Sequence, residues 1–483
     1  MSHKSSRRRV FLIQASAFER AFDHSMPLGL MALTAYLQRD RECVVRIFDM
    51  QHDCHGIERV VEAAKGFAPD VLGIGGMSTD AEVILALARR LKATFPGIPL
   101  VVGGAHAGHR AEDLAAVADI DYVVAGEGEI ATVSLLDHLD GRIPVEDVPS
   151  LVRRDGDRVV RTDSAPPILD LDALPFPAID AIDVDAYYRI SRPGYFYARR
   201  RYAVMMTSRG CPFGCSYCHH IHGRKYRYRS PENVLAEMAM LRSEIDAQEF
   251  VFLDDLLNLP AGRLERIAEL IVERDWGVAL NMPTGLRGDL MSEETLRLLK
   301  RAGLFRCMFA IDTASPRLQK FTGRRLNVEK TLAMIRYARK IGILVHGTFI
   351  LGFPTETREE AALTVRTALE SDLHTAAFHR AVAFKGTKMY AQAVAAGAVN
   401  VDDPAGYDYK LDHGVNPSLM SEKDLVRIRK DAWRRFYLSP RRAAALIAFL
   451  PYWLRVMPMF FRMWFEKAWI PATPRSADAC TGV

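Results

Sequence analysis

The sequence lacks long apolar runs, a cleavable leader and blocks of like charge. In the most apolar segment, residues 441–470, the longest stretch without a charged side chain is the 12 residues Ala443–Leu454, short of the roughly 20 that a membrane-spanning helix needs. Near the N-terminus the apolar run Val10–Ile13 is too short for a signal-peptide core, and we expect it to be a buried strand. The net charge is +5 and no run of like charge exceeds three residues, so nucleic-acid binding is not predicted.

Cysteine is scarce, with seven residues in 483, which fits a reducing cytosol and predicts a cytoplasmic protein. Four of the seven are scattered without the spacing of a disulfide framework: Cys43, Cys54, Cys307 and Cys480. The other three, Cys211, Cys215 and Cys218, form a Cys-x3-Cys-x2-Cys cluster. Because three is an odd number, a disulfide interpretation of the cluster is weak.

The cysteine cluster predicts a metal site on one tight loop. Three thiolates can hold three corners of a cubic iron–sulfur cluster and leave the fourth iron without a protein ligand. His219 follows directly, so a structural zinc site with three cysteines and a histidine is the alternative. Zinc knuckles usually pair two short hooks, and a single hook that contains Gly210, Pro212 and Gly214 matches them poorly.

The first 140 residues alternate short apolar runs with amphipathic stretches. The alternation predicts a doubly wound, Rossmann-like α/β domain with a parallel sheet. The expected strands are Val10–Ile13, Val44–Phe48, Val71–Ile74, Leu100–Val102 and Tyr122–Val124. No G-x-G-x-x-G fingerprint is present, but glycines follow the strands, where such sheets bind ligands. These glycines are Gly76, Gly103, Gly104, Gly126 and Gly128.

A second alternation of strands and helices starts at Tyr202 and predicts a partial, TIM-like (β/α)6 barrel. Its expected strands are Ala203–Thr207, Glu249–Leu253, Val278–Met282, Phe305–Ile311, Leu344–Leu351 and Thr375–Val382. The cysteine loop follows the first of them. Reactive groups of such barrels lie at the carboxyl ends of the strands, which is where this loop is expected.

The chain is predicted to have four parts. They are an N-terminal α/β domain (1–140), a linker (141–196), the barrel (197–400) and a helical C-terminal extension (401–483). The linker is expected to hold a hairpin over 151–160 with an Asp155-Gly156 turn. Residues 441–470 are expected to be a helix pair that caps the barrel or contacts a partner; the alternative is peripheral contact with a membrane, at its inner face.

The segment Ser208–His219, with Tyr217 before the last cysteine, resembles the signature of the radical S-adenosylmethionine (SAM) enzymes. The phrases Pro27–Leu37, Pro69–Thr79, Val101–His106 and Asp121–Glu129 resemble the cobalamin-binding domain that precedes the barrel in one large subfamily. The resemblance implies a [4Fe–4S] cluster, SAM and cobalamin as cofactors. It also implies a small-molecule substrate and an electron donor of the flavodoxin or ferredoxin type.

The resemblance implies a set of SAM-binding residues in the barrel. They are Tyr217, Asp254, Asp255, Asp312, Ser315, Ile350 and Phe353. One of the paired carboxylates Asp254 and Asp255 would accept from the SAM ammonium, and Asp312 would accept from the ribose hydroxyls. A carboxylate at the start of a helix is the alternative for Asp312. Ile350 and Phe353 would pack against the adenine, although a buried strand needs such residues in any case.

Cobalamin contacts are expected from Ser78, Thr79, His106 and Glu127 besides the five glycines named above. Ser78 and Thr79 are expected to bond the nucleotide tail of the corrin or to cap the next helix. The Asp-x-His-x-x-Gly motif that supplies a histidine to cobalt in other cobalamin proteins is absent, because Glu58 replaces its glycine in the nearest match, Asp53–Glu58. His52, His55 and His106 are therefore interpreted as surface or loop residues.

In the subfamily, one SAM is cleaved at the cluster to give a 5′-deoxyadenosyl radical, and cobalamin carries a methyl group from another. The resemblance thus predicts a methyltransferase that acts on an unactivated carbon. Two alternatives stay open: an oxidoreductase or cyclase of the tetrapyrrole ring-forming type, and a non-catalytic cobalamin sensor with a structural metal. Substrate contacts are expected after Val401, from Tyr407, Tyr409 and His413 among others, and the apolar tail hints at a lipid, polyketide or tetrapyrrole.

Overall fold

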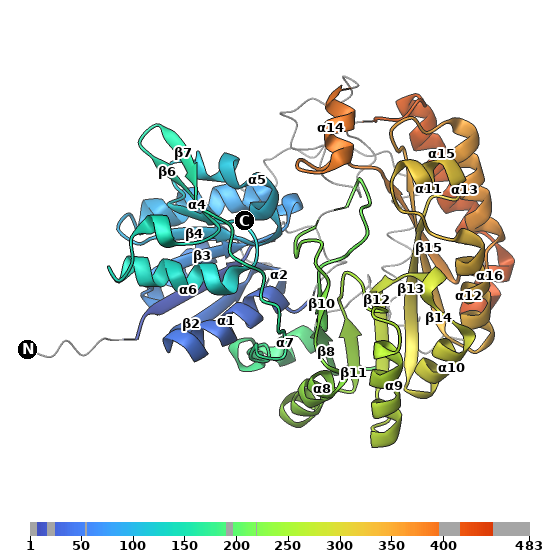
Figure 1. Cartoon of the computed structure of the whole chain (residues 1–483), viewed down its shortest axis with the longest axis horizontal. Helices are drawn as coiled ribbons and strands as arrows, with labels where there is room; N and C mark the ends of the chain where they lie inside the picture. Colours follow the sequence, from blue (N-terminus) through green and yellow to red (C-terminus); the bar gives the residue numbers. More distant parts are fainter. Residues whose placement is uncertain are drawn as a thin grey trace, which may run out of the picture. The chain divides into compact units, whose positions relative to one another are not determined.

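The computed structural model divides into two compact units, residues 1–190 and 191–483, and each is considered by itself (Figure 1). The structure describes residues 7–16, 25–53, 56–189, 197–218, 220–395 and 416–447.

The first unit is built on a seven-stranded sheet with the order β2-β1-β3-β4-β5-β6-β7. Its strands are β1 (Arg9–Gln14), β2 (Val44–Asp49), β3 (Val71–Gly75), β4 (Leu100–Gly103), β5 (Tyr122–Val124), β6 (Leu151–Asp155) and β7 (Arg158–Arg161). The pairs among β1 to β5 are all parallel, as predicted from the alternation. All five predicted strands are confirmed; β1, β3, β4 and β5 are apolar runs that lie mostly buried between two layers of helices, whereas β2 forms an edge of the sheet and is only partly buried.

Helices cover both faces of this sheet, which confirms the doubly wound architecture (Figure 1). The helices are α1 (Leu28–Arg41), α2 (Met50–Asp53), α3 (Ile57–Phe67), α4 (Ala81–Thr94), α5 (Gly104–Ala115) and α6 (Gly128–Leu139). Alternate side chains of β1 reach the two cores: Phe11 packs with α3, α4 and α5, whereas Leu12 packs with α1 and α6.

The predicted hairpin is present, but it belongs to the N-terminal sheet. Strand β6 pairs antiparallel with β5, and β7 pairs with β6. Asp155 pairs with Arg158, so the two-residue loop is Gly156-Asp157 and the predicted Asp155-Gly156 turn is displaced by one residue. The proline-rich stretch that follows also packs on the first unit, through α7 (Val184–Arg189), where the Tyr187 hydroxyl donates to Asp49 at 2.5 Å.

The second unit holds a six-stranded parallel sheet with the order β15-β14-β13-β12-β11-β8. Its strands are β8 (Tyr202–Met205), β11 (Glu249–Phe252), β12 (Ala279–Leu286), β13 (Leu304–Asp312), β14 (Leu344–Leu351) and β15 (Thr375–Arg380). All six predicted barrel strands are confirmed. The described parts of β8 and β15 do not pair, so the barrel is partial, as predicted.

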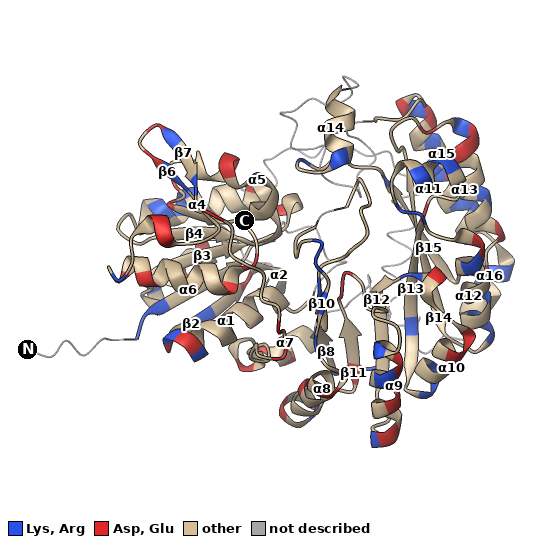
Figure 2. Ribbon diagram, viewed as in Figure 1, with Lys and Arg blue, Asp and Glu red and all other residues tan. Residues whose placement is uncertain are grey.

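Helices between these strands form the outer layer of the partial barrel (Figure 1). They are α8 (Pro231–Ile245), α9 (Arg263–Arg274), α10 (Glu293–Arg301), α11 (Pro316–Phe321), α12 (Val328–Lys340) and α13 (Arg358–Glu370). Helix α14 (Lys388–Ala395) follows the last strand, β15. Acidic and basic residues are mixed along the outer helices, in agreement with the absence of charge blocks in the sequence (Figure 2).

Two C-terminal helices, α15 (Glu422–Tyr437) and α16 (Pro440–Ile447), follow the barrel. Helix α15 contacts β15 and α13, and the Arg442 side chain on α16 donates to the carbonyls of Ala368, Leu369 and Ser371 at the end of α13. A cation there satisfies carbonyls that lack partners within α13. The predicted helical extension is thus present as far as the structure describes it, and no described helix is long and apolar enough to span a membrane.

Candidate active site at the cysteine loop

The cysteine loop directly follows the first barrel strand, as predicted. Short strands β9 (Ser208–Arg209) and β10 (Arg227–Tyr228) pair antiparallel and close its base. Gly210 has φ of +84°, and a Cβ there would lie 2.5 Å from the Lys225 carbonyl oxygen, so only glycine fits the entry to the loop. The Cys211 amide donates to the Gly223 carbonyl at 3.2 Å, which holds the first cysteine in place.

Neighbouring elements fix the rest of the loop. The Ser216 amide donates to the Thr322 carbonyl at 2.7 Å, and the Met389 amide donates to the Ser216 carbonyl at 2.9 Å. A Cβ on Gly323 would lie 2.9 Å from the Gly214 carbonyl oxygen. The loop is therefore held between the end of α11 and the start of α14, which gives the three thiols a defined frame.

The thiols lie in a partly desolvated environment. Cys215 is buried, Cys211 is half-buried and Cys218 reaches the surface. Desolvation raises the pKa of Cys211, and it raises the pKa of Cys218 to about 12 with a further contribution from the charges of Cys215 and Cys211. A bound cation reverses this preference, because metal coordination deprotonates thiols. The loop thus has little tendency to carry thiolates until iron binds.

Tyr217, Asp312 and Arg324 form a buried network beside the loop. The Tyr217 hydroxyl donates to Asp312 Oδ2 at 2.5 Å, and Arg324 Nε lies 3.0 Å from the same oxygen. Arg324 also donates to the Ala310 carbonyl and contacts the Cys215 thiol. Burial is the largest single influence on Arg324 and opposes its charge, but Asp312, Tyr217 and Cys215 together outweigh burial and raise the pKa of the guanidinium. Burial and then the charge of Asp312 raise the pKa of Tyr217 well above 10.

Asp312 ends β13 in a left-handed conformation, with φ of +63°. It does not cap a helix, since Ser315 occupies the N-cap position of α11 and accepts from the Leu318 amide at 3.2 Å. The alternative interpretation of Asp312 as a helix-start carboxylate is therefore wrong. The Ser315 hydroxyl donates to Glu360 at 2.6 Å, so its bonding capacity is used within the protein fold.

Apolar side chains lie next to Tyr217. Its ring and that of Phe353 have centroids 5.2 Å apart and are tilted, and Ile350 packs in the same cluster. Phe353 is fully buried. The structure therefore brings together Tyr217, Asp312, Ile350 and Phe353 from three segments of the sequence, next to the cysteines.

The two adjacent carboxylates after β11 have different environments. Asp254 is buried, and its Oδ1 accepts from the Thr207 amide at 3.0 Å, the Thr207 hydroxyl at 2.8 Å and the Ser208 hydroxyl at 2.5 Å. Desolvation raises the pKa of Asp254. Asp255 is exposed, and its charge acts on the Cys211 and Cys218 thiols. Asp254 thus ties β11 to the base of the loop, whereas Asp255 faces the cysteines.

The carboxyl edge of the first sheet is lined by glycines. Gly104 has φ of +83°, and a Cβ there would lie 3.4 Å from the Gly76 amide nitrogen. Nothing lies within 4 Å of a Cβ placed on Gly103 or Gly126. Gly128 begins α6. The edge therefore has close backbone packing beside open space, which suits the approach of a large planar ligand.

Polar residues at this edge differ from expectation. His106 is buried in α5, so its interpretation as a surface or loop residue is wrong; desolvation lowers its pKa to about 4, and its Nδ1 lies 3.3 Å from the Ser78 hydroxyl. Ser78 and Thr79 do not cap α4, because Asp80 holds that position. The Thr79 hydroxyl is buried without a hydrogen-bond partner. Glu127 occupies the N-cap position of α6.

Comparison with known families identifies both units. The radical SAM superfamily matches residues 205–368, and the B12 binding domain matches residues 18–136. This chain is a radical SAM protein with a B12-binding domain. The radical SAM match spans the cysteine loop and the SAM-site network, and the B12-binding match spans the glycine-lined sheet edge.

Similar proteins are named mostly as methyltransferases. A protein of Pyrococcus horikoshii described as an uncharacterized methyltransferase is 28% identical over 86% of this chain and 88% of its own length. The cytidylyl-2-hydroxyethylphosphonate methyltransferase of Streptomyces wedmorensis is 29% identical over 71% of this chain and 70% of its own. The anaerobic magnesium-protoporphyrin IX monomethyl ester cyclase of Rubrivivax gelatinosus is 27% identical over 71% of this chain and 61% of its own.

A solved structure shares the fold. It is the radical SAM methyltransferase TsrM from Kitasatospora setae with cobalamin and a [4Fe–4S] cluster bound; it superposes with a TM-score of 0.67 at 20% identity, over 82% of this chain and 79% of that one. At this identity the likeness shows the shared fold; that the protein is a radical SAM enzyme rests on its radical SAM domain and on relatives named as methyltransferases.

The side chains present fit the cofactors of this family. Three cysteines on one anchored loop match a cubane with one open iron, and Arg324 supplies positive charge beside Cys215. Among the described residues, no three His, Cys, Asp or Glu side chains converge on a point that would hold a single metal ion, and His219 lies outside those residues. In a cubane each thiolate binds a different iron, so such convergence is not required. The unpartnered Thr79 hydroxyl and the open glycines suit cobalamin.

Arg324 is the residue that sequence reasoning missed. It lies in a loop without a recognisable motif, and no periodicity distinguishes it from its neighbours. Other predicted residues cannot be compared with the structure: His55, Tyr407, Tyr409 and His413 lie outside the described residues, and the side chain of His52 is not described.

Proposed function

We propose that this protein methylates an unactivated carbon of a small-molecule substrate, with SAM as the methyl source. The observation that carries the proposal is the presence, in one chain, of an anchored three-cysteine loop at the end of β8 and a glycine-lined B12-binding edge. When bound, the cluster supplies an electron that cleaves SAM, and cobalamin supplies a carrier for a methyl group. This pair of reagents suits a carbon that has no acidic proton.

Cys211, Cys215 and Cys218 would hold the cluster. Asp255 is the better candidate of the two adjacent carboxylates for the SAM ammonium, because the buried Asp254 is already bonded to Thr207 and Ser208. Asp312 would accept from the ribose hydroxyls, with Tyr217 and Arg324 fixing its orientation. Ile350 and Phe353 would bound the adenine site and exclude water, while Ser315 would act by shaping the start of α11.

The B12-binding edge would position the second cofactor. Gly76, Gly103, Gly104, Gly126 and Gly128 would let the backbone approach the corrin closely. Thr79 would bond the nucleotide tail, since its hydroxyl has no partner in the protein. His106 would contact the cofactor as a neutral imidazole; its bond to Ser78 makes both residues part of the wall.

The test is an anaerobic turnover assay with SAM labelled at the methyl group. Candidate substrates are the classes named for the relatives: phosphonate nucleotides, hopanoid lipids and metalloporphyrin esters. We expect labelled product to accumulate together with S-adenosylhomocysteine and 5′-deoxyadenosine. Product formation without S-adenosylhomocysteine would overturn methyl transfer.

Ring formation is a second candidate, because the Rubrivivax gelatinosus cyclase is nearly as similar to this chain as the methyltransferases are. In that case 5′-deoxyadenosine appears during turnover, and the label leaves with methionine and does not enter the product. The same assay therefore separates the two outcomes. Iron and sulfide analysis of anaerobically purified protein tests the cluster independently, since zinc without labile sulfide would exclude both.

Two partners are part of the proposal. The cluster needs an external one-electron donor, considered below. The remainder of the apolar segment 441–470 is proposed to contact a membrane surface peripherally, and the support for this is the sequence alone, since Arg442 at its start is buried against α13 and residues from 448 onward lie outside the described structure.

A further inference from the structure

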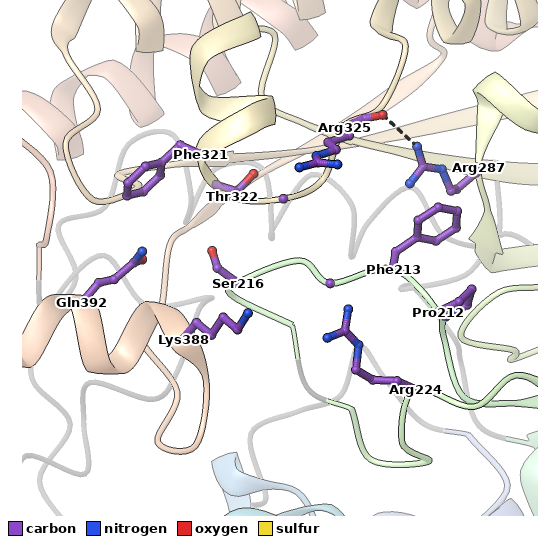
Figure 3. Close-up of a pocket in the computed structure, with 12 residues that line it drawn as sticks. Pro212, Phe213, Ser216, Arg224, Arg287, Phe321, Thr322, Arg325, Lys388 and Gln392 are labelled. Atoms are coloured by element: carbon purple, nitrogen blue, oxygen red, sulfur yellow. Dashed lines mark hydrogen bonds between the residues drawn. The ribbon is translucent and has the colours of Figure 1, made fainter.

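A cavity of about 560 Å³ lies against the cysteine loop in the second unit (Figure 3). Its walls come from four segments: the cysteine loop as far as Arg224, Arg287 after β12, the end of α11 with the residues after it, and α14. Pro212, Phe213, Gly214 and Ser216 line it, whereas the three cysteines between and beside them do not. The cavity therefore backs the loop on the side away from the thiols.

Very little protein separates the cavity from the loop backbone. Gly214 and Gly323, which both line the cavity, have no side chains, and a Cβ on Gly214 would lie 2.4 Å from Arg224 Nη2. Consecutive Cα atoms are about 3.8 Å apart, so a group seated in the cavity lies within one or two residues of the cysteines.

The cavity is basic: Arg287, one of the four cations that line it, is paired with Asp289, and the other three are uncompensated. Arg224, Arg325 and Lys388 are exposed, and in the described structure none of them makes a hydrogen bond or ion pair through its side chain. No carboxylate is among the described residues that line the cavity. Elsewhere in the unit, exposed arginines have acidic partners, such as Arg266 with Glu269 and Arg317 with Glu360.

The basic side chains reach the cavity from separate segments. In Figure 3 the Arg224 and Lys388 side chains approach it from the cysteine-loop segment and from α14, and Arg325 lies across from them. The hydroxyl of Ser216, which is 6% exposed, lines the cavity without a hydrogen-bond partner. Three free cations and an unpartnered buried hydroxyl indicate that an acidic group completes this site.

We propose that this cavity is the docking site of an acidic one-electron donor protein, of the reduced flavoprotein or iron–sulfur protein class, whose surface carboxylates seat against Arg224, Arg325 and Lys388. The donor loses one electron and the cluster gains it; no bond forms or breaks and no proton moves. The inference rests on the cluster of the proposed function, but not on methyl transfer. A small anion is the competing occupant, and the test distinguishes it.

The physical reason for the basic surface is the rate of encounter. Opposite charges on two proteins raise association rates by about 10- to 1,000-fold, and salt removes most of the gain. Docking at this cavity places the donor against the backbone of the cysteine loop, next to the residues that would hold the cluster. One face of the cysteine loop would therefore bind the cluster, and the opposite face would bind the electron donor.

The experiment measures reduction of the cluster in the full-length, anaerobically reconstituted protein after rapid mixing, by absorbance and electron paramagnetic resonance. Three reductants are compared: a reduced flavodoxin, the small anion dithionite and the viologen radical cation. For Arg325→Glu/Lys388→Glu we expect reduction by flavodoxin at low salt to slow by about 10- to 100-fold. Reduction by viologen is expected to stay unchanged, and the salt dependence with flavodoxin to flatten.

Two variants serve as controls. Lys330→Glu/Lys340→Glu changes the same number of charges on exposed residues of α12, away from the cavity, and should leave flavodoxin-driven reduction within about twofold, because screening limits the effect of distant exposed charges. Arg325→Lys/Lys388→Arg keeps both charges and should restore the wild-type rate. Binding of oxidised flavodoxin, read from flavin fluorescence, should weaken only in the charge-reversed variant.

Two results would overturn the proposal. If dithionite slows as much as flavodoxin, the cavity recognises a small anion. If flavodoxin-driven reduction and flavodoxin binding are unchanged, the donor docks elsewhere. Neither result bears on methyl transfer, which the labelled-SAM assay measures separately.

Discussion

The carboxyl ends of the two parallel sheets have opposite characters. In the B12-binding unit the edge consists of glycines, small hydroxyls and the neutral, buried His106. In the radical SAM unit the edge carries three thiols, the carboxylates of Asp255 and Asp312, and the guanidinium of Arg324. Strand order places both edges at the same topological position of an α/β sheet.

The difference follows from what each edge must hold. A large ring needs backbone approach and open space, so glycines and small hydroxyl side chains line most of the first edge. A small charged cluster and SAM need fixed ligands and compensating charge, so the second edge accumulates them in a desolvated network. Open packing serves the first site and tight electrostatic coupling serves the second, and the effects of substitutions should differ accordingly.

The largest effect should come from the charged edge. Cys215→Ser removes one of only three ligands, so we expect cluster content to fall to a small residual level and 5′-deoxyadenosine formation to be lost. Iron and sulfide analysis and the turnover assay measure both. Cys307→Ala, at a buried thiol in β13, is the matched control: it should cost about 1 kcal/mol of stability and leave the cluster intact. Equal cluster loss in both variants would contradict the assignment of the ligands.

The buried ion pair should give the next largest effect. Asp312→Asn leaves the Arg324 charge without its partner in a buried site, so we expect a loss of about 3 to 5 kcal/mol in the free energy of unfolding, together with weaker SAM binding. Urea denaturation and calorimetric titration measure these. The double variant Asp312→Asn/Arg324→Met should lose less than the sum of the single changes, because the two groups interact directly. Additive losses would show that the pair is not coupled.

A buried carboxyl group behind the proposed SAM site should make the stability of the protein fall as the pH rises. Glu356 accepts from the amides of Gly352 and Phe353, and burial raises its pKa to about 7. A raised pKa means that the fold favours the protonated form, so stability should fall as the pH rises from 4.5 to 7, by about 1.4 kcal/mol per unit of pKa shift. In Glu356→Gln, unfolding free energies measured across this range should lose that slope. An unchanged slope would assign it to other groups.

At the B12-binding edge the stability should depend on pH in the opposite direction and should fall as the pH drops. Burial lowers the pKa of His106 from 6.5 to about 4, so the fold favours the neutral imidazole. Stability should be complete above pH 6.5 and should fall as the pH drops toward 4. Hydrogen exchange resolved to α5 measures this, and His106→Gln should flatten the profile. Loss of stability in α5 on raising the pH would contradict the neutral state.

The smallest effect comes from a single methyl group at the first edge. Gly104→Ala places a Cβ at φ of +83° and close to Gly76, so we expect a loss of about 1 to 2 kcal/mol and weaker cobalamin binding, seen by thermal unfolding and absorbance titration. Gly108→Ala, in the same helix with open space around the new Cβ, should be neutral or stabilising by up to about 1 kcal/mol. Equal effects at both positions would show that the strained conformation at Gly104 has no role.

The sequence alone determined the eleven strands predicted for the two sheets, because buried parallel strands are continuous apolar runs whatever surrounds them. It also determined the cysteine loop, since the spacing of the ligands is local and the loop follows its strand directly. The sequence predicted that β6 and β7 form a hairpin. It did not predict that the hairpin joins the first sheet, because β6 pairs there with β5 and no local pattern encodes that contact.

The tertiary structure decided which of two neighbouring residues supports the fold and which faces the site. Asp254 and Asp255 are equivalent in the sequence, yet successive side chains leave a strand end in different directions, so one is buried against Thr207 and the other faces the cysteines. Arg324 joined the site, and His106 entered the core, through contacts with residues distant in the chain. The basic cavity likewise exists only because four separate segments meet behind the loop. Spacing fixes a motif, whereas burial and charge environment arise from packing between segments far apart in the sequence.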